Sequence, residues 1–127
     1  IVKAYEAGAT HAEECMDPHT HAMGIRVPKA IGDFLILQAV RESGGFAIAV
    51  DEDAIEKART LCGREDGLLL CPEGAATLAA YQQAVSDGRL EKDATAMLFN
   101  CGNGLKYPMP DRARTLDRHK DVDWGVM

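Results

Sequence analysis

The sequence predicts an α/β fold, namely part of a three-layer, mostly parallel sheet with flanking helices. Segments with helical apolar periodicity alternate with short apolar runs at 46–50, 68–71 and 94–100. These runs lack the polar alternation of a strand with one wet face, which favours strands covered on both sides. Helices between strands favour parallel pairing, because a parallel connection requires a long crossover.

The first two helices are predicted at residues 1–7 and 28–43. Gly8 and Gly44 end them, since glycine readily adopts the left-handed conformation that follows many helices. The polar residues of the second helix form only a narrow strip along its surface. This pattern predicts that the helix is mostly buried. Its apolar positions are Ala30, Ile31, Phe34, Leu35, Leu37, Ala39 and Val40.

Two further helices have clear start signals. Asp51 is a good N-cap for a helix whose apolar face comprises Ala54, Ile55, Ala58, Leu61 and Cys62. Pro72 suits the first turn of an alanine-rich helix that ends at Gly88. Both helices should therefore lie between strands of the sheet.

The connection at 9–27 is predicted to be irregular. It carries four potential metal ligands, which are His11, Cys15, His19 and His21. Their spacing matches no closed four-ligand zinc pattern, so no metal site is expected.

Composition indicates one soluble globular domain. The 127 residues are 46% hydrophobic and 27% charged, with a net charge of −6. Without a run of Lys and Arg, binding to nucleic acid or to an anionic membrane is not expected. The default is a cytoplasmic protein whose four cysteines are reduced.

The number of predicted strands is small for a parallel sheet. With only two or three strands, the edge strands of the sheet would lack hydrogen-bonding neighbours. The chain also opens on helix-like composition without an initiator Met. We expect a piece of a longer protein, with the missing strands upstream of Ile1 or in another copy. Self-association, most simply as a homodimer, is therefore expected.

The stretch FNCGNGLKYP at 99–108 is the main candidate for a binding site. It follows the last apolar run, and its two glycines can adopt positive φ and let another group come close to the bare backbone. Ligands of open α/β sheets bind outside the carboxyl ends of the strands. The sequence therefore predicts that another group lies against the end of this apolar run, beside Cys101 and Gly102.

Three collinear motifs carry a family resemblance. GIRVPKAIGDFLILQAVRESGG at 24–45, CPEGAATLAA at 71–80 and LFNCGNGLKYP at 98–108 resemble the C-terminal part of threonine synthases. The resemblance implies that residues 1–110 are an incomplete, C-terminal portion of the large domain of a fold type II pyridoxal-phosphate enzyme. Residues 111–127 would be a polar C-terminal tail.

The resemblance also implies an activity. Threonine synthases convert O-phosphohomoserine and water into threonine and phosphate, with pyridoxal 5'-phosphate as cofactor. Sister enzymes of the same fold, such as serine/threonine dehydratases and cysteate synthase, share parts of the pattern. The third hypothesis, besides a threonine synthase and a sister enzyme, is a non-catalytic, self-associating α/β module.

Cofactor contacts follow from the resemblance residue by residue. Cys101 occupies the position of the pyridine-nitrogen partner, where threonine synthases usually have Thr, and Gly102 follows it. Asn100 and Glu73 are weaker candidates. From the residues alone, the favoured interpretation of Cys101 is a small buried strand residue, and that of Glu73 is a first-turn carboxylate stabilised by the helix dipole.

No catalytic residue is expected in this chain. The family's Schiff-base lysine lies in the upstream portion, and no lysine of this chain has a comparable context. The lysines are Lys3, Lys29, Lys57, Lys92, Lys106 and Lys120. The expected partners are the upstream part of the same enzyme and a small amino-acid substrate.

Overall fold

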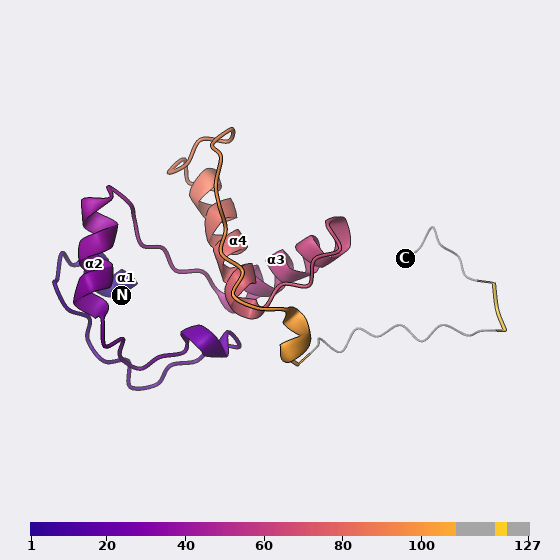
Figure 1. Cartoon of the computed structure of the whole chain (residues 1–127), viewed down its shortest axis with the longest axis horizontal. Helices are drawn as coiled ribbons and strands as arrows, with labels where there is room; N and C mark the ends of the chain where they lie inside the picture. The colour runs from indigo at the N-terminus through magenta and orange to yellow at the C-terminus, as the bar shows by residue number, and fades with distance from the viewer. Residues whose placement is uncertain (109–118, 122–127) are drawn as a thin grey trace.

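In the computed structural model, which describes residues 1–108 and 119–121, the chain is mainly helical (Figure 1). Figure 1 shows α1 and α2 close together on the left, with α3 and α4 together to their right. The helices are α1 (Val2–Glu6), α2 (Asp33–Glu42), α3 (Glu52–Glu65) and α4 (Pro72–Ser86), with 3-10 turns η1 (Met23–Ile25) and η2 (Gly104–Lys106). Most of the tail predicted at 111–127 lies outside the described residues.

Helices α1 and α2 end where the glycines predict. Gly8 and Gly44 both have a φ of 68°, a conformation that side-chain-bearing residues seldom adopt. The two helices are tied together by Arg41, which donates to the Ala9 carbonyl over 2.8 Å. Its guanidinium carbon also lies 5.8 Å from the centroid of the Tyr5 ring.

Helix α2 is shorter and more exposed than predicted. It begins at Asp33 rather than Pro28, because Gly32 is its N-cap and glycine disfavours helix continuation. Within α2 only Asp33 and Leu37 are buried, so the expectation of a mostly buried helix is wrong for this chain. The large apolar residues exposed here are Ile31, which precedes α2, and Phe34, Leu35 and Ile36 within it.

Asp33 anchors the start of α2 to the preceding connection. Its carboxylate accepts hydrogen bonds from the backbone N–H groups of Ala12 over 2.7 Å and Phe34 over 2.6 Å. The His11 imidazole lies 3.3 Å away. The Ala12 bond is the strongest of the influences that together lower the pKa of Asp33, while desolvation opposes them.

The lowered pKa of Asp33 predicts that the stability of the local structure around it depends on pH. Because the pKa of Asp33 is lower in the folded protein, its contribution to stability is present above the unfolded value of about 4 and is lost as the pH falls through the folded value. We expect the amide NMR signals of Ala12 and Phe34 to shift together in acid. Asp33→Asn should abolish this titration, whereas Ala12 and Phe34 signals that do not change down to about pH 2 would contradict it.

Helices α3 and α4 follow the sequence prediction closely. Asp51 caps α3, accepting a hydrogen bond from the Ala54 N–H over 2.7 Å. The two helices pack together around a small core of Ile55, Ala58, Cys62, Leu70, Ala75, Ala76 and Ala79. Leu61 was predicted in this face but is 38% exposed, so its assignment was wrong.

The predicted sheet is unconfirmed. Among the described residues there is no strand, and a single antiparallel bridge joins Leu70 to Asn103. Residues 46–50 and 94–100 therefore have no strand partners there. Apolar side chains of the second segment lie open, with Met97 89% and Phe99 77% exposed.

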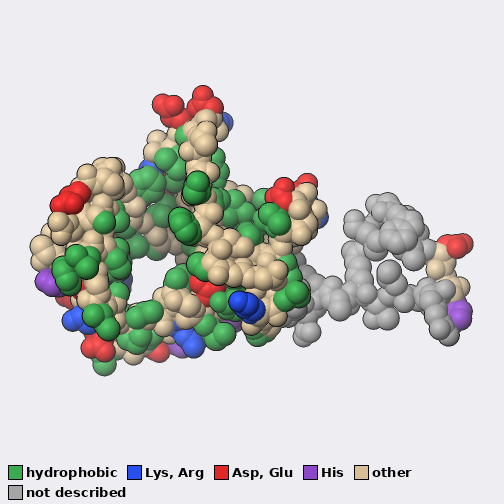
Figure 2. All heavy atoms as spheres, viewed as in Figure 1, with side chains coloured by type: hydrophobic (Ala, Val, Ile, Leu, Met, Phe, Trp, Pro, Cys, Tyr) green, Lys and Arg blue, Asp and Glu red, His purple; other side chains and the backbone are tan. Residues whose placement is uncertain are grey.

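Figure 2 shows an opening between the α1–α2 end and the α3–α4 pair, bordered largely by hydrophobic side chains. A β-strand needs a neighbouring strand for its backbone hydrogen bonds, and the described residues supply no strand partner to the segments at 46–50 and 94–100. None of the described helices combines the length and the hydropathy needed to cross a bilayer.

Candidate functional site

The segment at 99–104 lies along the N-terminal part of α4 (Figure 1). The Thr77 hydroxyl donates to the Phe99 carbonyl over 3.3 Å, and the backbone N–H of Cys71 donates to the Gly102 carbonyl over 3.3 Å. The start of α4 thus holds the part of the segment that contains Cys101 and Gly102.

The glycines of this segment serve close approach rather than unusual backbone angles. Neither Gly102 nor Gly104 has a positive φ, so the segment does not use that freedom. A Cβ at Gly104 would lie 2.5 Å from the Leu70 carbonyl oxygen, which confirms close approach there. A Cβ at Gly102 would meet only the Cβ of Cys71, at an ordinary 3.9 Å. The described chain therefore does not itself fill the space beside Gly102.

Cys101 is exposed, which disagrees with its interpretation as a buried packing residue. Within the described part of the chain, no hydrogen bond to its thiol is found. An open thiol beside a residue without a side chain fits the approach of a flat ring with a polar edge atom. Asn100 is also exposed, but its side-chain oxygen accepts a hydrogen bond from the Cys71 thiol over 3.3 Å.

Glu73 is buried at the second position of α4, with 5% of its surface exposed. One carboxylate oxygen accepts a hydrogen bond from the Gly24 N–H over 2.6 Å. The other has no partner within hydrogen-bond geometry among the described residues, although the Tyr107 hydroxyl lies nearby. Glu73 therefore joins the 9–27 connection to α4 through Gly24. Its role as a cofactor contact stays a prediction.

The Glu73 carboxylate is held in its charged form. Desolvation is the largest single influence and raises its pKa, but hydrogen bonds from its own N–H and that of Gly24, helped by Tyr107 and Cys71, outweigh desolvation and lower the pKa. The neighbouring carboxylate in turn raises the pKa of Tyr107. This pair fixes a negative charge at the positive end of α4.

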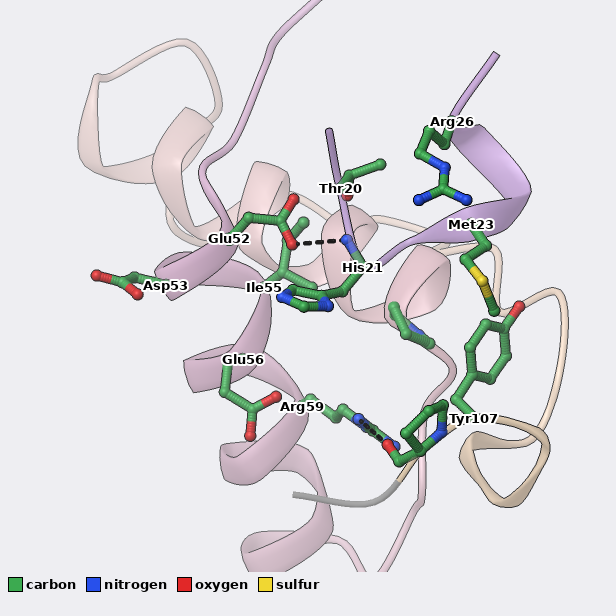
Figure 3. Close-up of a pocket in the computed structure, with 12 residues that line it drawn as sticks. Thr20, His21, Met23, Arg26, Glu52, Asp53, Ile55, Glu56, Arg59 and Tyr107 are labelled. Carbon is green, nitrogen blue, oxygen red and sulfur yellow. Dashed lines mark hydrogen bonds between the residues drawn. The ribbon is translucent and has the colours of Figure 1, made fainter. Parts of the chain in front are cut away.

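A cavity of about 440 Å³ lies beside the start of α4, with Pro72 and Tyr107 among its lining residues (Figure 3). Glu52 lines it and accepts a hydrogen bond from the His21 N–H over 3.0 Å. Figure 3 shows this bond, with Arg59 below it and Tyr107 at the side. Cys101 and Gly102 do not line this cavity.

Sequence reasoning missed Arg59, which is only 7% exposed. Its guanidinium donates to the Gly104 carbonyl over 3.4 Å and to the Pro108 carbonyl over 3.5 Å. Arg59 thus fastens α3 to the end of the candidate segment. The available signal was its place beside Ala58 on the apolar face of α3, where an arginine needs acceptors.

Comparisons with known proteins identify similar sequences. Residues 1–102 match the family described as pyridoxal-phosphate dependent enzyme. The threonine synthase of Methanosarcina acetivorans is 33% identical over 108 residues, which are 85% of this chain and 27% of that protein. The threonine synthase of Methanocaldococcus jannaschii is 30% identical over the same shares.

A bacterial relative gives a similar result. The threonine synthase of Mycobacterium tuberculosis is 30% identical over 96 residues, covering 76% of this chain and 27% of that protein. The similarity to threonine synthases that the three motifs indicated is confirmed. The chain spans about a quarter of the length of these curated relatives, 27% in each case.

Proposed function

This chain belongs to the family of pyridoxal-phosphate dependent enzymes, and from that premise we propose that it is the C-terminal portion of a threonine synthase-like lyase. The proposed reaction converts O-phosphohomoserine and water into threonine and phosphate. Residues 1–110 would form part of the large domain. The observation that carries the proposal is the open Cys101–Gly102 site at the end of a segment fixed to α4.

The residues at this site fit the cofactor. Cys101 would face the pyridine nitrogen with a neutral thiol, and Gly102 would leave room for the ring. When bound, pyridoxal phosphate supplies an electron sink for negative charge that develops on an amino-acid substrate. The thiol would tune that sink, because a pyridine nitrogen beside a neutral partner withdraws less electron density than one that a carboxylate keeps protonated.

The exposed apolar segments support a proposal about partners. We assign 46–50 and 94–100 to strands of a three-layer, mostly parallel sheet whose other strands belong to the upstream part of the same enzyme. The exposed residues of α2 would be covered in the same assembly. A homodimer in the cytoplasm is the proposed state of the whole protein.

The function is tested with the complete cofactor-loaded enzyme. We expect phosphate release from O-phosphohomoserine with formation of threonine, and no comparable conversion of free serine or threonine. Efficient deamination of serine or threonine would instead identify a dehydratase. Production of cysteate from O-phosphoserine and sulfite would identify a cysteate synthase.

The 127-residue chain is the matched control. Without an upstream lysine it should release no phosphate even with added cofactor, and its exposed apolar surface should drive self-association in sedimentation experiments. Turnover by this chain would place the covalent chemistry on one of its own lysines. A stable monomer at high concentration would contradict the proposed covering of its strands.

A further inference from the structure

We propose that Cys71 is a positioning residue that sets the location of Cys101. This inference rests on the proposed function, since it assumes that the Cys101 thiol faces the cofactor. Cys101 is exposed and has no described hydrogen-bond partner of its own, so its place depends on the residues before and after it. Both of those residues are held by Cys71.

The contacts of Cys71 are made by its thiol and by its backbone. The thiol donates to the side-chain oxygen of Asn100 over 3.3 Å, and the backbone N–H donates to the Gly102 carbonyl over 3.3 Å. Cys71 is 1% exposed, so water does not compete for these groups. Asn100 and Gly102 flank Cys101, and both are thereby tied to one residue.

The same thiol is also the N-cap of α4. It accepts a hydrogen bond from the Gly74 N–H over 3.3 Å. Serine, threonine, asparagine and aspartate are the usual N-caps, and a thiol is a weaker acceptor than their oxygens. Cysteine at this position is therefore poorly explained by capping alone. The Cys71 thiol accepts a hydrogen bond from the first turn of α4 and donates one to Asn100. It thereby couples that turn to the residue next to Cys101, the proposed cofactor contact.

The experiment compares variants of the complete enzyme, with the affinity of the apoenzyme for pyridoxal phosphate and the absorbance of the bound cofactor as readouts. Cys71→Ala should weaken cofactor affinity about fivefold, the equivalent of one lost hydrogen bond of about 1 kcal/mol. It should also shift the absorbance. Cys71→Ser keeps a donor and an acceptor and should restore both readouts to within about twofold.

The matched control is Asp51→Ala, which removes the N-cap of the neighbouring helix. Asp51 accepts from the residue three positions on, as Cys71 does, but caps α3. Its loss should lower stability like the loss of a typical cap and leave both cofactor readouts unchanged. If Cys71→Ala behaves like Asp51→Ala in both readouts, Cys71 is only a cap and the inference is wrong.

A double-mutant cycle identifies the route of the effect. In an Asn100→Ala background, Cys71→Ala should cause little further loss of affinity, because the acceptor is already gone. Fully additive losses would overturn the proposed coupling. Cys101→Ala separates the two hypotheses: if it changes neither readout, the proposed cofactor site itself fails. If Cys101→Ala changes both readouts and Cys71→Ala changes neither, the site stands and the positioning role fails.

Discussion

Replacing Gly74 with alanine is expected to lower the free energy of unfolding by about 2 kcal/mol, although alanine is the better helix former. A Cβ at Gly74 would overlap the side-chain oxygen of Asn100 and would lie 3.3 Å from its Cα. Overpacking of this kind typically costs about 1–3 kcal/mol. The clash should outweigh the gain in helix propensity of at most about 1 kcal/mol.

Gly63 in α3 is the matched control for this substitution. A Cβ there would meet only the Leu68 carbonyl oxygen, at 4.0 Å. Gly63→Ala should therefore raise stability by up to about 1 kcal/mol through helix propensity alone. Denaturant unfolding of both variants should give opposite signs. Stabilisation by both substitutions would mean that the exposed Asn100 side chain moves away from α4 at little cost, and the predicted clash would be wrong.

Gly74→Ala should also weaken binding of the cofactor in the complete enzyme. Displacing Asn100 breaks the hydrogen bond from the Cys71 thiol and moves the residue next to Cys101. We expect weaker cofactor binding and an altered absorbance in Gly74→Ala, with both unchanged in Gly63→Ala. If Gly74→Ala is destabilised but binds the cofactor normally, the packing of Asn100 against α4 does not influence the cofactor site.

The features that sequence predicted correctly are local ones. Asp51 and Pro72 mark the starts of α3 and α4, and Gly8, Gly44 and Gly88 adopt positive φ at helix ends. Each signal depends on residues within one turn of the chain. For this reason the helical boundaries near these residues were predictable without knowledge of the rest of the protein.

The failures concern contacts with distant residues. The apolar periodicity at 28–43 predicted a mostly buried helix, but periodicity does not say which residues cover an apolar face, and α2 is largely exposed in the described chain. Leu35 is 58% exposed because the described chain does not reach it. The same limit applies to 94–100, since a strand is defined by partners from other segments. Sequence also missed Arg59, whose acceptors at Gly104 and Pro108 lie far along the chain.

The candidate site was predictable in part. Cys101 and Gly102 were selected from the residues and from the family resemblance, and the structure leaves both open on one side. The contribution of Cys71 was not visible, because a thiol that caps one helix and also holds a distant segment has no sequence signature. The buried Glu73 was noticed, whereas its bond to Gly24 required the fold.

Substitutions at Cys101 are expected to have the largest effect on chemistry. Cys101→Thr should keep cofactor affinity and activity in the complete enzyme, because a hydroxyl can make the same neutral contact with the pyridine nitrogen. Cys101→Ala should weaken cofactor affinity about fivefold, the scale of one lost hydrogen bond. Cys101→Asp should slow threonine formation by at least about tenfold, or about 1.4 kcal/mol in the barrier.

The aspartate effect has a specific electrostatic cause. A carboxylate beside the pyridine nitrogen favours its protonated form, which strengthens the electron sink and changes which bond of the substrate is broken most easily. The measurements are the absorbance of the bound cofactor and the ratio of threonine to side products in folded variants. If Cys101→Thr and Cys101→Ala both match the unsubstituted enzyme in affinity, absorbance and products, Cys101 has no place in the cofactor site.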